Sequence, residues 1–267
     1  MKLFELLADM PVSTVRGDTD VDITGISKDS REAKEGYIFF ATKASKIYIE
    51  DVLRKGARAI VSDTDPGIAL PCLIITKDVR ALLGAMASKF YNFPSRKFTV
   101  IGITGTNGKT TTGYLIESII KAANKKTAII GTISHRYNGR VLKAKNTTPG
   151  AVELQALLKD IHDAQCEYVI MEVSSHALDQ RRVEGIDFDY AIFTNLTHDH
   201  LDYHGNIEHY LEAKKLFFTY YLPKSTKKKK CALLNLDDPV SQDFIPDKSV
   251  KTFFYSINKK ADAYLTD

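Results

Sequence analysis

Residues 101–112 read Ile101-Gly102-Ile103-Thr104-Gly105-Thr106-Asn107-Gly108-Lys109-Thr110-Thr111-Thr112. A β-branched apolar run at residues 98–101 leads into this stretch, and apolar side chains at helical spacing follow it over residues 114–120. A strand, a glycine loop and a helix in this order form the context of a phosphate-binding loop. The strict Walker pattern has a glycine where this chain has Ile103, so the motif is a variant. The alternative, a plain glycine turn, is disfavoured because Gly-Lys-Thr stands at the start of the predicted helix.

The loop residues have distinct expected roles in binding a nucleotide. Gly105 and Gly108 allow backbone amides to turn toward one anion, and the helix N-terminus adds its partial positive charge. Lys109 can reach the β- and γ-phosphates, and the Thr110 hydroxyl can hold Mg²⁺. The residues expected to contact the nucleotide are Thr104, Gly105, Thr106, Asn107, Gly108, Lys109, Thr110 and Thr111.

The composition is that of an ordinary globular protein, and 267 residues are enough for one large or two ordinary domains. A net charge of +4 is too small to indicate nucleic-acid binding. Cys72, Cys166 and Cys231 are widely spaced, which fits a reducing cytoplasm and argues against a disulfide framework or a zinc site. Residues 1–9 predict a short amphipathic helix rather than a signal peptide, and no apolar run approaches the length of a membrane span.

Two α/β domains are expected, with a break near Pro94. Residues 1–94 alternate strand-like and helical runs and end in a helix predicted over residues 79–91. Residues 95–267 contain the phosphate loop and further alternation, which indicates a mostly parallel sheet. The predicted fold class is therefore α/β, with a small N-terminal domain followed by a phosphate-loop ATPase domain. In the first domain, Lys28-Asp29-Ser30-Arg31 predicts a polar turn, to which the residues alone assign no role.

Polar side chains follow two strand-like runs of the second domain. Glu172 stands near the end of the run at residues 168–173, and three histidines and two aspartates at residues 197–204 follow the next run. Ligands of open α/β sheets gather at the carboxyl ends of strands, so we expect Glu172 and His200 at one mouth, on neighbouring strands. His-x-His spacing can chelate zinc, but no cysteine joins the group, which favours Mg²⁺ with nucleotide phosphates. The structural alternatives are a solvent-facing acid for Glu172 and a plain polar loop for the histidines.

Motifs spread along nearly the whole chain resemble, in order, those of the Mur ligases, which are ATP-dependent amide-forming enzymes of peptidoglycan precursor synthesis. Agreement at so many ordered positions is not expected by chance. The matching stretches are Asp29-Ser30-Arg31, residues 104–111, residues 146–150, residues 172–178, Gln180-x-Arg182-Val183, residues 195–205 and Ala213-Lys214.

The resemblance implies catalytic and metal-binding roles, the catalytic ones falling on Lys109, Lys214 and His200. Lys109 and Thr110 would serve ATP and Mg²⁺, and Glu172 would bind the first metal ion. His200 and Lys214 would bind a second one, with Lys214 carried as a carbamate, which turns a cationic amine into an oxygen ligand. Since one helix position rotates a side chain by about 100°, Lys214 should then point inward, unlike the next residue.

The resemblance also implies the substrate and its contacts. Lys28 and Ser30 would lie against the uridine end. The residues expected to hold the muramoyl peptide are Asn146, Thr147, Thr148, Ser174, Gln180 and Arg182. In the implied reaction, ATP phosphorylates the terminal carboxylate of UDP-N-acetylmuramoyl-L-alanyl-D-glutamate, and the amine of a diamino acid displaces phosphate. Diaminopimelate and lysine both stay open as that amine. A cytoplasmic protein is implied, monomeric in its full-length form, with no nucleic-acid partner.

The chain departs from the family pattern in two places. Residues 42–48 read Thr42-Lys43-Ala44-Ser45-Lys46-Ile47-Tyr48, where the family usually has a glycine-rich stretch, so different uridine-side contacts are expected there. The sequence also ends before the third domain that holds the amino acid in the family, so we expect these 267 residues alone not to complete the ligation. One alternative is a related amide ligase such as folylpolyglutamate synthetase, against which Asp29-Ser30-Arg31 argues. The other is a non-catalytic nucleotide or UDP-sugar binding fragment.

Overall fold

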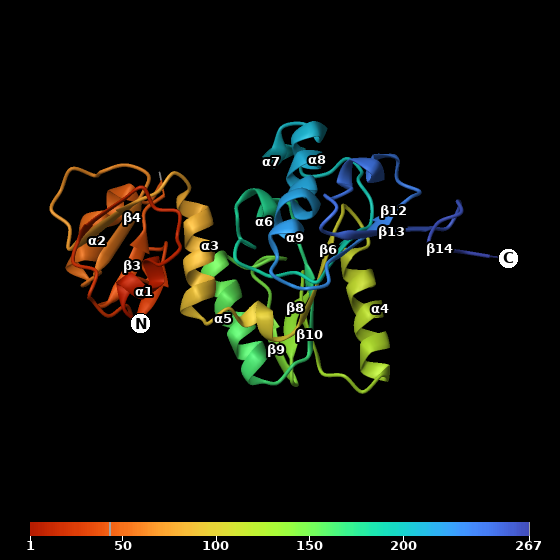
Figure 1. Cartoon of the computed structure of the whole chain (residues 1–267), viewed down its shortest axis with the longest axis horizontal. Coiled ribbons are helices and arrows are strands. Elements are labelled where there is room, and N and C mark those ends of the chain that lie inside the picture. The colour runs from red at the N-terminus through yellow and green to blue at the C-terminus, as the bar shows by residue number, and fades with distance from the viewer. Residues whose placement is uncertain (43, 267) are drawn as a thin grey trace. The chain divides into compact units, whose positions relative to one another are not determined.

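The computed structural model describes residues 1–42 and 44–266. The chain divides into two compact units, Met1–Asn92 and Phe93–Asp267. Both alternate strands with helices, which confirms the predicted α/β class (Figure 1). The departure predicted over residues 42–48 includes Lys43, which lies outside the described residues. Within the described ranges, no helix combines the length and the apolar character needed to cross a membrane.

The first unit is a mixed sheet with strand order β1-β5-β4-β3-β2. Strands β2 to β5 run parallel to their neighbours, and β1 pairs antiparallel with β5 at one edge. The last helix of this unit, α3, is capped at its N-terminus by Asp78, whose carboxylate accepts a hydrogen bond from the Ala81 amide at 2.9 Å. The elements are α1 (Leu3–Leu7), β1 (Thr14–Gly17), β2 (Gly25–Ser27), β3 (Tyr37–Phe40), η1 (Lys46–Tyr48), α2 (Ile49–Arg54), β4 (Ala59–Ser62), β5 (Cys72–Ile75) and α3 (Val79–Phe90).

The second unit holds a larger sheet with strand order β14-β13-β12-β11-β6-β10-β7-β8-β9. Only the β7–β8 and β8–β9 pairs are antiparallel in the described part of this sheet, so it is mostly parallel as predicted. The strands are β6 (Thr99–Thr104), β7 (Thr127–Ile130), β8 (Ser134–Tyr137), β9 (Arg140–Lys143), β10 (Tyr168–Glu172), β11 (Tyr190–Phe193), β12 (Cys231–Asn235), β13 (Lys251–Ser256) and β14 (Ala263–Tyr264). The helices are η2 (Pro94–Lys97), α4 (Lys109–Ala122), α5 (Ala151–Asp163), α6 (Ser175–Asp179), α7 (Leu201–His204), α8 (Ile207–Leu216), η3 (Phe217–Tyr221), α9 (Leu222–Lys224) and η4 (Pro239–Phe244).

Helices cover both faces of this sheet, with α4 on one side and α5 on the other (Figure 1). Successive strand residues point to opposite faces, so a strand buried on both sides is apolar throughout. In β6, Val100 belongs to the cluster that includes the apolar face of α5, whereas Ile101 and Ile103 belong to the cluster packed against α4. The continuous apolar run in the sequence therefore reflects two separate cores.

Two observed elements were not indicated by the sequence pattern. An apolar helical pattern runs on from α8 to Tyr221, but the α-helix ends at Leu216 and the chain continues as a π-helical turn, η3. Phe217 and Phe218 are both fully buried in that turn, and a Cβ on Gly102 of β6 would lie 2.4 Å from the Phe217 ring. The sequence pattern also missed β1, because an edge strand of four residues that is largely exposed carries no apolar alternation.

Candidate active site

The phosphate loop lies at the carboxyl edge of the sheet in the second unit. It follows β6, and β6 is flanked by β10 on one side and β11 on the other. Glu172 ends β10, and His200 lies in the loop that follows β11, so both strands deliver polar residues to the mouth around the phosphate loop. The expectation that they come from adjacent strands was wrong, because β6 pairs with both and separates them.

The loop has a conformation that requires glycine. Gly105 has a φ of +147°, and a Cβ at this position would lie 1.9 Å from the Thr194 hydroxyl. That hydroxyl donates a hydrogen bond of 2.6 Å to the Asn107 carbonyl, and the Asn195 side chain accepts one of 2.9 Å from the Asn107 amide. The segment after β11 therefore braces the phosphate loop from outside. Gly108, with a φ of +84°, then turns the chain into α4.

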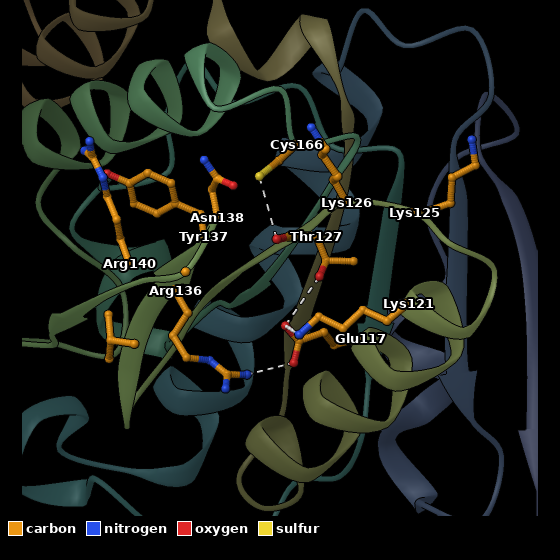
Figure 2. Close-up of a pocket in the computed structure, with 12 residues that line it drawn as sticks. Glu117, Lys121, Lys125, Lys126, Thr127, Arg136, Tyr137, Asn138, Arg140 and Cys166 are labelled. Atoms are coloured by element: carbon orange, nitrogen blue, oxygen red, sulfur yellow. Dashed lines mark hydrogen bonds and ion pairs between the residues drawn. The ribbon is translucent and has the colours of Figure 1, made fainter.

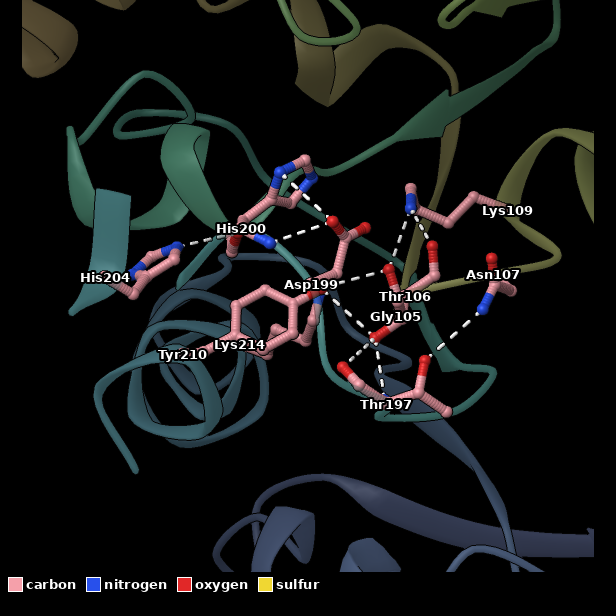
Figure 3. Close-up of polar contacts among 11 residues, drawn as sticks. Gly105, Thr106, Asn107, Lys109, Thr197, Asp199, His200, His204, Tyr210 and Lys214 are labelled. Atoms are coloured by element: carbon pink, nitrogen blue, oxygen red, sulfur yellow. Dashed lines mark hydrogen bonds and ion pairs between the residues drawn. The ribbon is translucent and has the colours of Figure 1, made fainter. Parts of the chain in front are cut away.

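Lys109 lies folded into the loop that it follows. Its ammonium donates hydrogen bonds to the Gly105 carbonyl at 2.8 Å and the Thr106 carbonyl at 2.9 Å (Figure 3). Burial lowers the pKa of Lys109, while the carboxylates of Glu172 and Asp199 act in the opposite direction. The side chain is thus already held where a phosphate bound by the loop would meet it.

Glu172 is buried and its carboxylate is fully engaged by hydroxyl and amide groups. It is 4% exposed, which rules out the alternative of a strand-end acid facing solvent. One oxygen accepts hydrogen bonds from the Thr110 hydroxyl at 2.9 Å and the Thr132 amide at 3.1 Å, and the other accepts from the Thr132 hydroxyl at 2.9 Å. A Cβ on Gly131 would lie 2.3 Å from this carboxylate, so a glycine is needed beside it.

Lys214 is the most deeply buried cation of the site. It is 1% exposed, donates a hydrogen bond of 2.9 Å to the Gly105 carbonyl, and lies 4.4 Å from the centre of the Tyr210 ring (Figure 3). Burial, with a further contribution from Lys109, holds the pKa of Lys214 well below its ordinary value. The adjacent Lys215 is half-buried and pairs with Glu212 at 3.1 Å. Although both lysines would ordinarily be solvated on a helix, only Lys215 reaches the surface.

His200 lies beside His176 and Tyr210. It has a φ of +52°, its side chain is half exposed, and its ring lies 5.0 Å from the His176 ring and 6.2 Å from the Tyr210 ring. His200 and Lys214 thus both lie near Tyr210. Within the described residues, the two side chains make no direct contact with each other. Over the residues that the structure describes, no three His, Cys, Asp or Glu side chains are arranged to hold a metal ion. The oxygen atoms of Thr110 and Glu172 are instead the donor types that Mg²⁺ prefers.

The residues expected to hold a peptide substrate are mostly connected to one another. The Thr148 hydroxyl donates to the Glu172 carbonyl at 2.8 Å and accepts from the Ser174 amide at 3.1 Å. The Arg182 guanidinium donates to the Thr148 carbonyl at 3.0 Å and to the Gln180 side chain at 2.8 Å. These residues form one hydrogen-bonded rim beside Glu172. The other two expected residues are Thr147, which contacts Thr132 at 3.0 Å, and Asn146, which is exposed.

Several site residues were not anticipated from the sequence. Thr132 lies just beyond the carboxyl end of β7, as Glu172 lies at the carboxyl end of β10. The rule that ligands gather at the carboxyl ends of parallel strands could therefore have indicated Thr132 as well. Tyr203 donates to Asp179 at 2.6 Å and accepts from Gln180 at 2.9 Å. Tyr210 contacts the Thr106 hydroxyl at 3.1 Å, far away in sequence. A tyrosine on an amphipathic helix gives no sequence signal that separates such a contact from ordinary packing.

In the first unit, the predicted polar turn follows β2. The Asp29 carboxylate accepts hydrogen bonds from the Arg31 backbone amide and side chain, and this pairing lowers the pKa of Asp29 to about 2. Lys55 donates a hydrogen bond of 2.7 Å to the Ser30 carbonyl, while Lys28 is exposed. The turn therefore presents Lys28 and the half-buried Ser30 on a backbone that Asp29 fixes.

Comparisons with known proteins agree with this geometry. Residues 103–267 match the Mur ligase middle domain. A UDP-N-acetylmuramoyl-L-alanyl-D-glutamate–2,6-diaminopimelate ligase of Caldanaerobacter subterraneus subsp. tengcongensis is 39% identical over 265 residues, 96% of this chain and 53% of the relative. A solved structure of a ligase with the same name superposes with a TM-score of 0.86 at 30% identity, covering 100% of this chain and 55% of the other.

A more distant solved structure shows a likeness of fold alone. It is the MurF ligase of Thermotoga maritima in complex with ADP, with a TM-score of 0.54 at 20% identity, covering 91% of this chain and 52% of the other. The chain spans about half the length of the relatives it matches, 53% in the case of the Caldanaerobacter protein.

Proposed function

Because the chain belongs to the Mur ligase family, we propose that it carries the ATP site and the muramoyl-substrate site of a ligase that adds diaminopimelate to UDP-N-acetylmuramoyl-L-alanyl-D-glutamate. The observation that carries the proposal is the group formed by Lys109, Thr110 and Glu172. It combines a cation folded into a phosphate loop with a hydroxyl and a carboxylate 2.9 Å apart. The names of the relatives favour diaminopimelate over lysine as the incoming amine.

The proposed reaction needs charge neutralisation and exclusion of water more than covalent help from the protein. The terminal carboxylate of the dipeptide attacks the γ-phosphorus of ATP, ADP leaves, and an acyl phosphate forms. The amine then attacks the acyl carbon, phosphate leaves, and an amide remains. Lys109 would pair with the phosphate oxygens during the first step. The rim formed by Thr148, Ser174 and Arg182 would position the carboxylate beside the loop.

The oxygen donors of the site fit a magnesium ion. Thr110 and Glu172 offer a hydroxyl and a carboxylate in contact, and Thr132 orients that carboxylate through two hydrogen bonds. Mg²⁺ bound there would neutralise charge on the phosphates. We propose Lys214, as a carbamate, together with His200, as the second set of ligands. Burial and the nearby Lys109 lower the pKa of Lys214, which favours its neutral amine. This supports the carbamate, because CO₂ reacts with the neutral form of an amine.

Replacing Thr132 with valine is expected to weaken Mg²⁺ binding in the nucleotide complex by roughly 10- to 100-fold, the usual loss when a group that orients a metal ligand is removed. The valine keeps the backbone hydrogen bond to Glu172 and loses the hydroxyl one. The measurement is the Mg²⁺ dependence of nucleotide binding by calorimetry. Thr147→Val is the matched control, because it removes the Thr132 contact and spares Glu172. Equal Mg²⁺ affinity in Thr132→Val and the parent would contradict the assignment.

The experiment that tests the function supplies protein containing this chain with ATP, Mg²⁺, UDP-N-acetylmuramoyl-L-alanyl-D-glutamate and either meso-diaminopimelate or lysine. We expect ADP release to depend on the muramoyl dipeptide. We also expect the diaminopimelate-containing tripeptide to form, and mass spectrometry detects it. UDP-N-acetylmuramoyl-L-alanine is the control substrate, since it lacks the glutamate whose carboxylate is phosphorylated in the proposed reaction. ADP release that is indifferent to the muramoyl dipeptide would overturn the proposal, and binding of UDP-sugar without turnover would favour a non-catalytic binding protein.

A further inference from the structure

Tyr203 joins the segment after β11 to the hydrogen-bonded rim beside Glu172. Its hydroxyl donates a hydrogen bond of 2.6 Å to the Asp179 carboxylate and accepts one of 2.9 Å from the Gln180 side chain. Gln180 in turn accepts hydrogen bonds from the Arg182 guanidinium, at 3.1 Å from Nε and at 2.8 Å from Nη2. Because Asp179, Gln180 and Arg182 all follow β10, this series of hydrogen bonds connects the loops of two different strands.

The two ends of the series fix the direction of every bond in it. A guanidinium can only donate, so the Gln180 atom that faces Arg182 is the carbonyl oxygen. A carboxylate can only accept, so the Tyr203 proton points to Asp179 and the hydroxyl oxygen accepts from the Gln180 amide nitrogen. The Tyr203 hydroxyl therefore selects one of the two orientations of the Gln180 amide, and it is the orientation that suits Arg182.

The ring and backbone of Tyr203 are held by contacts that do not involve its hydroxyl. The ring centre lies 4.1 Å from that of His176 on α6, with the two planes inclined by 35°. The Tyr203 amide donates a hydrogen bond of 3.2 Å to the His200 carbonyl. Removing the hydroxyl alone is therefore expected to release Gln180 and to leave α7 in place.

Arg182 carries the orientation set by Tyr203 into the rim. Its Nη1 donates a hydrogen bond of 3.0 Å to the Thr148 carbonyl, and the Thr148 hydroxyl donates one of 2.8 Å to the Glu172 carbonyl. Contacts from Gln180 and Thr148 thus fix the planar guanidinium of the half-buried Arg182 in one orientation. A guanidinium held in this way suits the recognition of a carboxylate, because both groups are planar and their hydrogen bonds depend on angle.

We propose that Tyr203 is a positioning residue for the muramoyl dipeptide. It orients Gln180, and through Gln180 the Arg182 guanidinium that meets a carboxylate of the substrate. This inference rests on the proposed function. It gives Tyr203 no contact with the reacting atoms and no part in nucleotide binding, so loss of the hydroxyl is expected to weaken the binding of the dipeptide and to spare that of ATP.

Tyr203→Phe tests this role in protein containing the chain. Calorimetry is expected to show that Kd for UDP-N-acetylmuramoyl-L-alanyl-D-glutamate rises about three- to tenfold, the effect of losing one hydrogen bond, while Kd for ATP stays the same. Gln180→Met removes the group through which Tyr203 acts. In that background Tyr203→Phe is expected to cause no further rise, because the two residues act in series.

Tyr137→Phe is the matched control. Tyr137 lines a cavity near the start of β7, where it pairs with Ala128 across the β7–β8 ladder (Figure 2). The same change of tyrosine to phenylalanine there removes a hydroxyl from the second unit without touching Gln180 or Arg182. It is expected to leave the affinities for the dipeptide and for ATP unchanged, and circular dichroism checks that each variant is folded.

The Arg182 Nε–H resonance provides a readout that needs no substrate. We expect it to exchange with water faster in Tyr203→Phe than in the parent, because Gln180 no longer keeps its carbonyl toward Arg182. Equal exchange in the two proteins would overturn the positioning role. So would equal affinity for the dipeptide in a parent and a variant that both bind it. A parent that binds no dipeptide would refute the proposed function itself, and this inference with it.

Discussion

Replacing Lys109 with alanine is expected to weaken nucleotide binding about a hundredfold or more while the chain stays folded. The ammonium now donates to the carbonyls of Gly105 and Thr106 and would transfer these bonds to the β- and γ-phosphates. A charge-assisted hydrogen bond contributes about 1.5–3 kcal/mol, so the loss of two corresponds to at least a factor of about 100 in Kd. Calorimetry with ATP and with ADP measures the effect.

The fold should survive this change because the loop keeps its other supports. Gly105 still accepts a hydrogen bond from Lys214, and Asn107 is still held by Thr194 and Asn195. Lys159→Ala is the control, since it removes one partly exposed cation on α5, far in sequence from the loop. Unchanged nucleotide affinity in Lys109→Ala, with a native circular dichroism spectrum, would show that the loop is not the nucleotide site.

The sequence predicted the parts of the fold that depend on local pattern. The strand, glycine loop and helix at residues 98–120 could be read directly, because apolar periodicity and Gly-Lys-Thr are local signals. The order of strands could not. That β6 separates β10 from β11 is a property of the crossover connections, and the apolar runs of all three strands look alike in sequence. The π-helical turn after α8 is likewise set by packing of Phe217 near Gly102.

The candidate site was predictable where a residue type is unusual at its position. An acid at the end of an apolar strand, as in Glu172, is such a case. Thr132 and Tyr210 were not predicted, because hydroxyl groups are common in loops and on helices and mark no chemistry by themselves. The burial of Lys214 could be predicted only from the family resemblance. A lysine on an amphipathic helix is ordinarily solvated, and its contact with Gly105 spans 109 positions of the chain.

Replacing Lys214 with methionine is expected to lower the rate of ligation on the order of 10²–10³-fold, comparable to the removal of one key electrostatic group from an active site. Methionine retains most of the buried stem, so the packing around Tyr210 and Ala213 is disturbed little. The lowered pKa of Lys214 increases the fraction of neutral amine near neutral pH, and this is the form that CO₂ converts to a carbamate. The ammonium form would instead repel both Mg²⁺ and Lys109.

Labelled bicarbonate provides a direct readout of this chemistry, separate from activity. With ¹³C-bicarbonate, Mg²⁺ and nucleotide, a carbamate resonance is expected in the parent protein and absent from Lys214→Met. Lys215→Met is the matched control, because Lys215 is the adjacent lysine and its ammonium pairs with Glu212 at the surface rather than pointing into the site. It should retain both the resonance and the rate. A resonance of equal intensity in Lys214→Met, or none in the parent with metal and nucleotide bound, would remove Lys214 from the metal site and leave it as a buried donor that holds the Gly105 carbonyl.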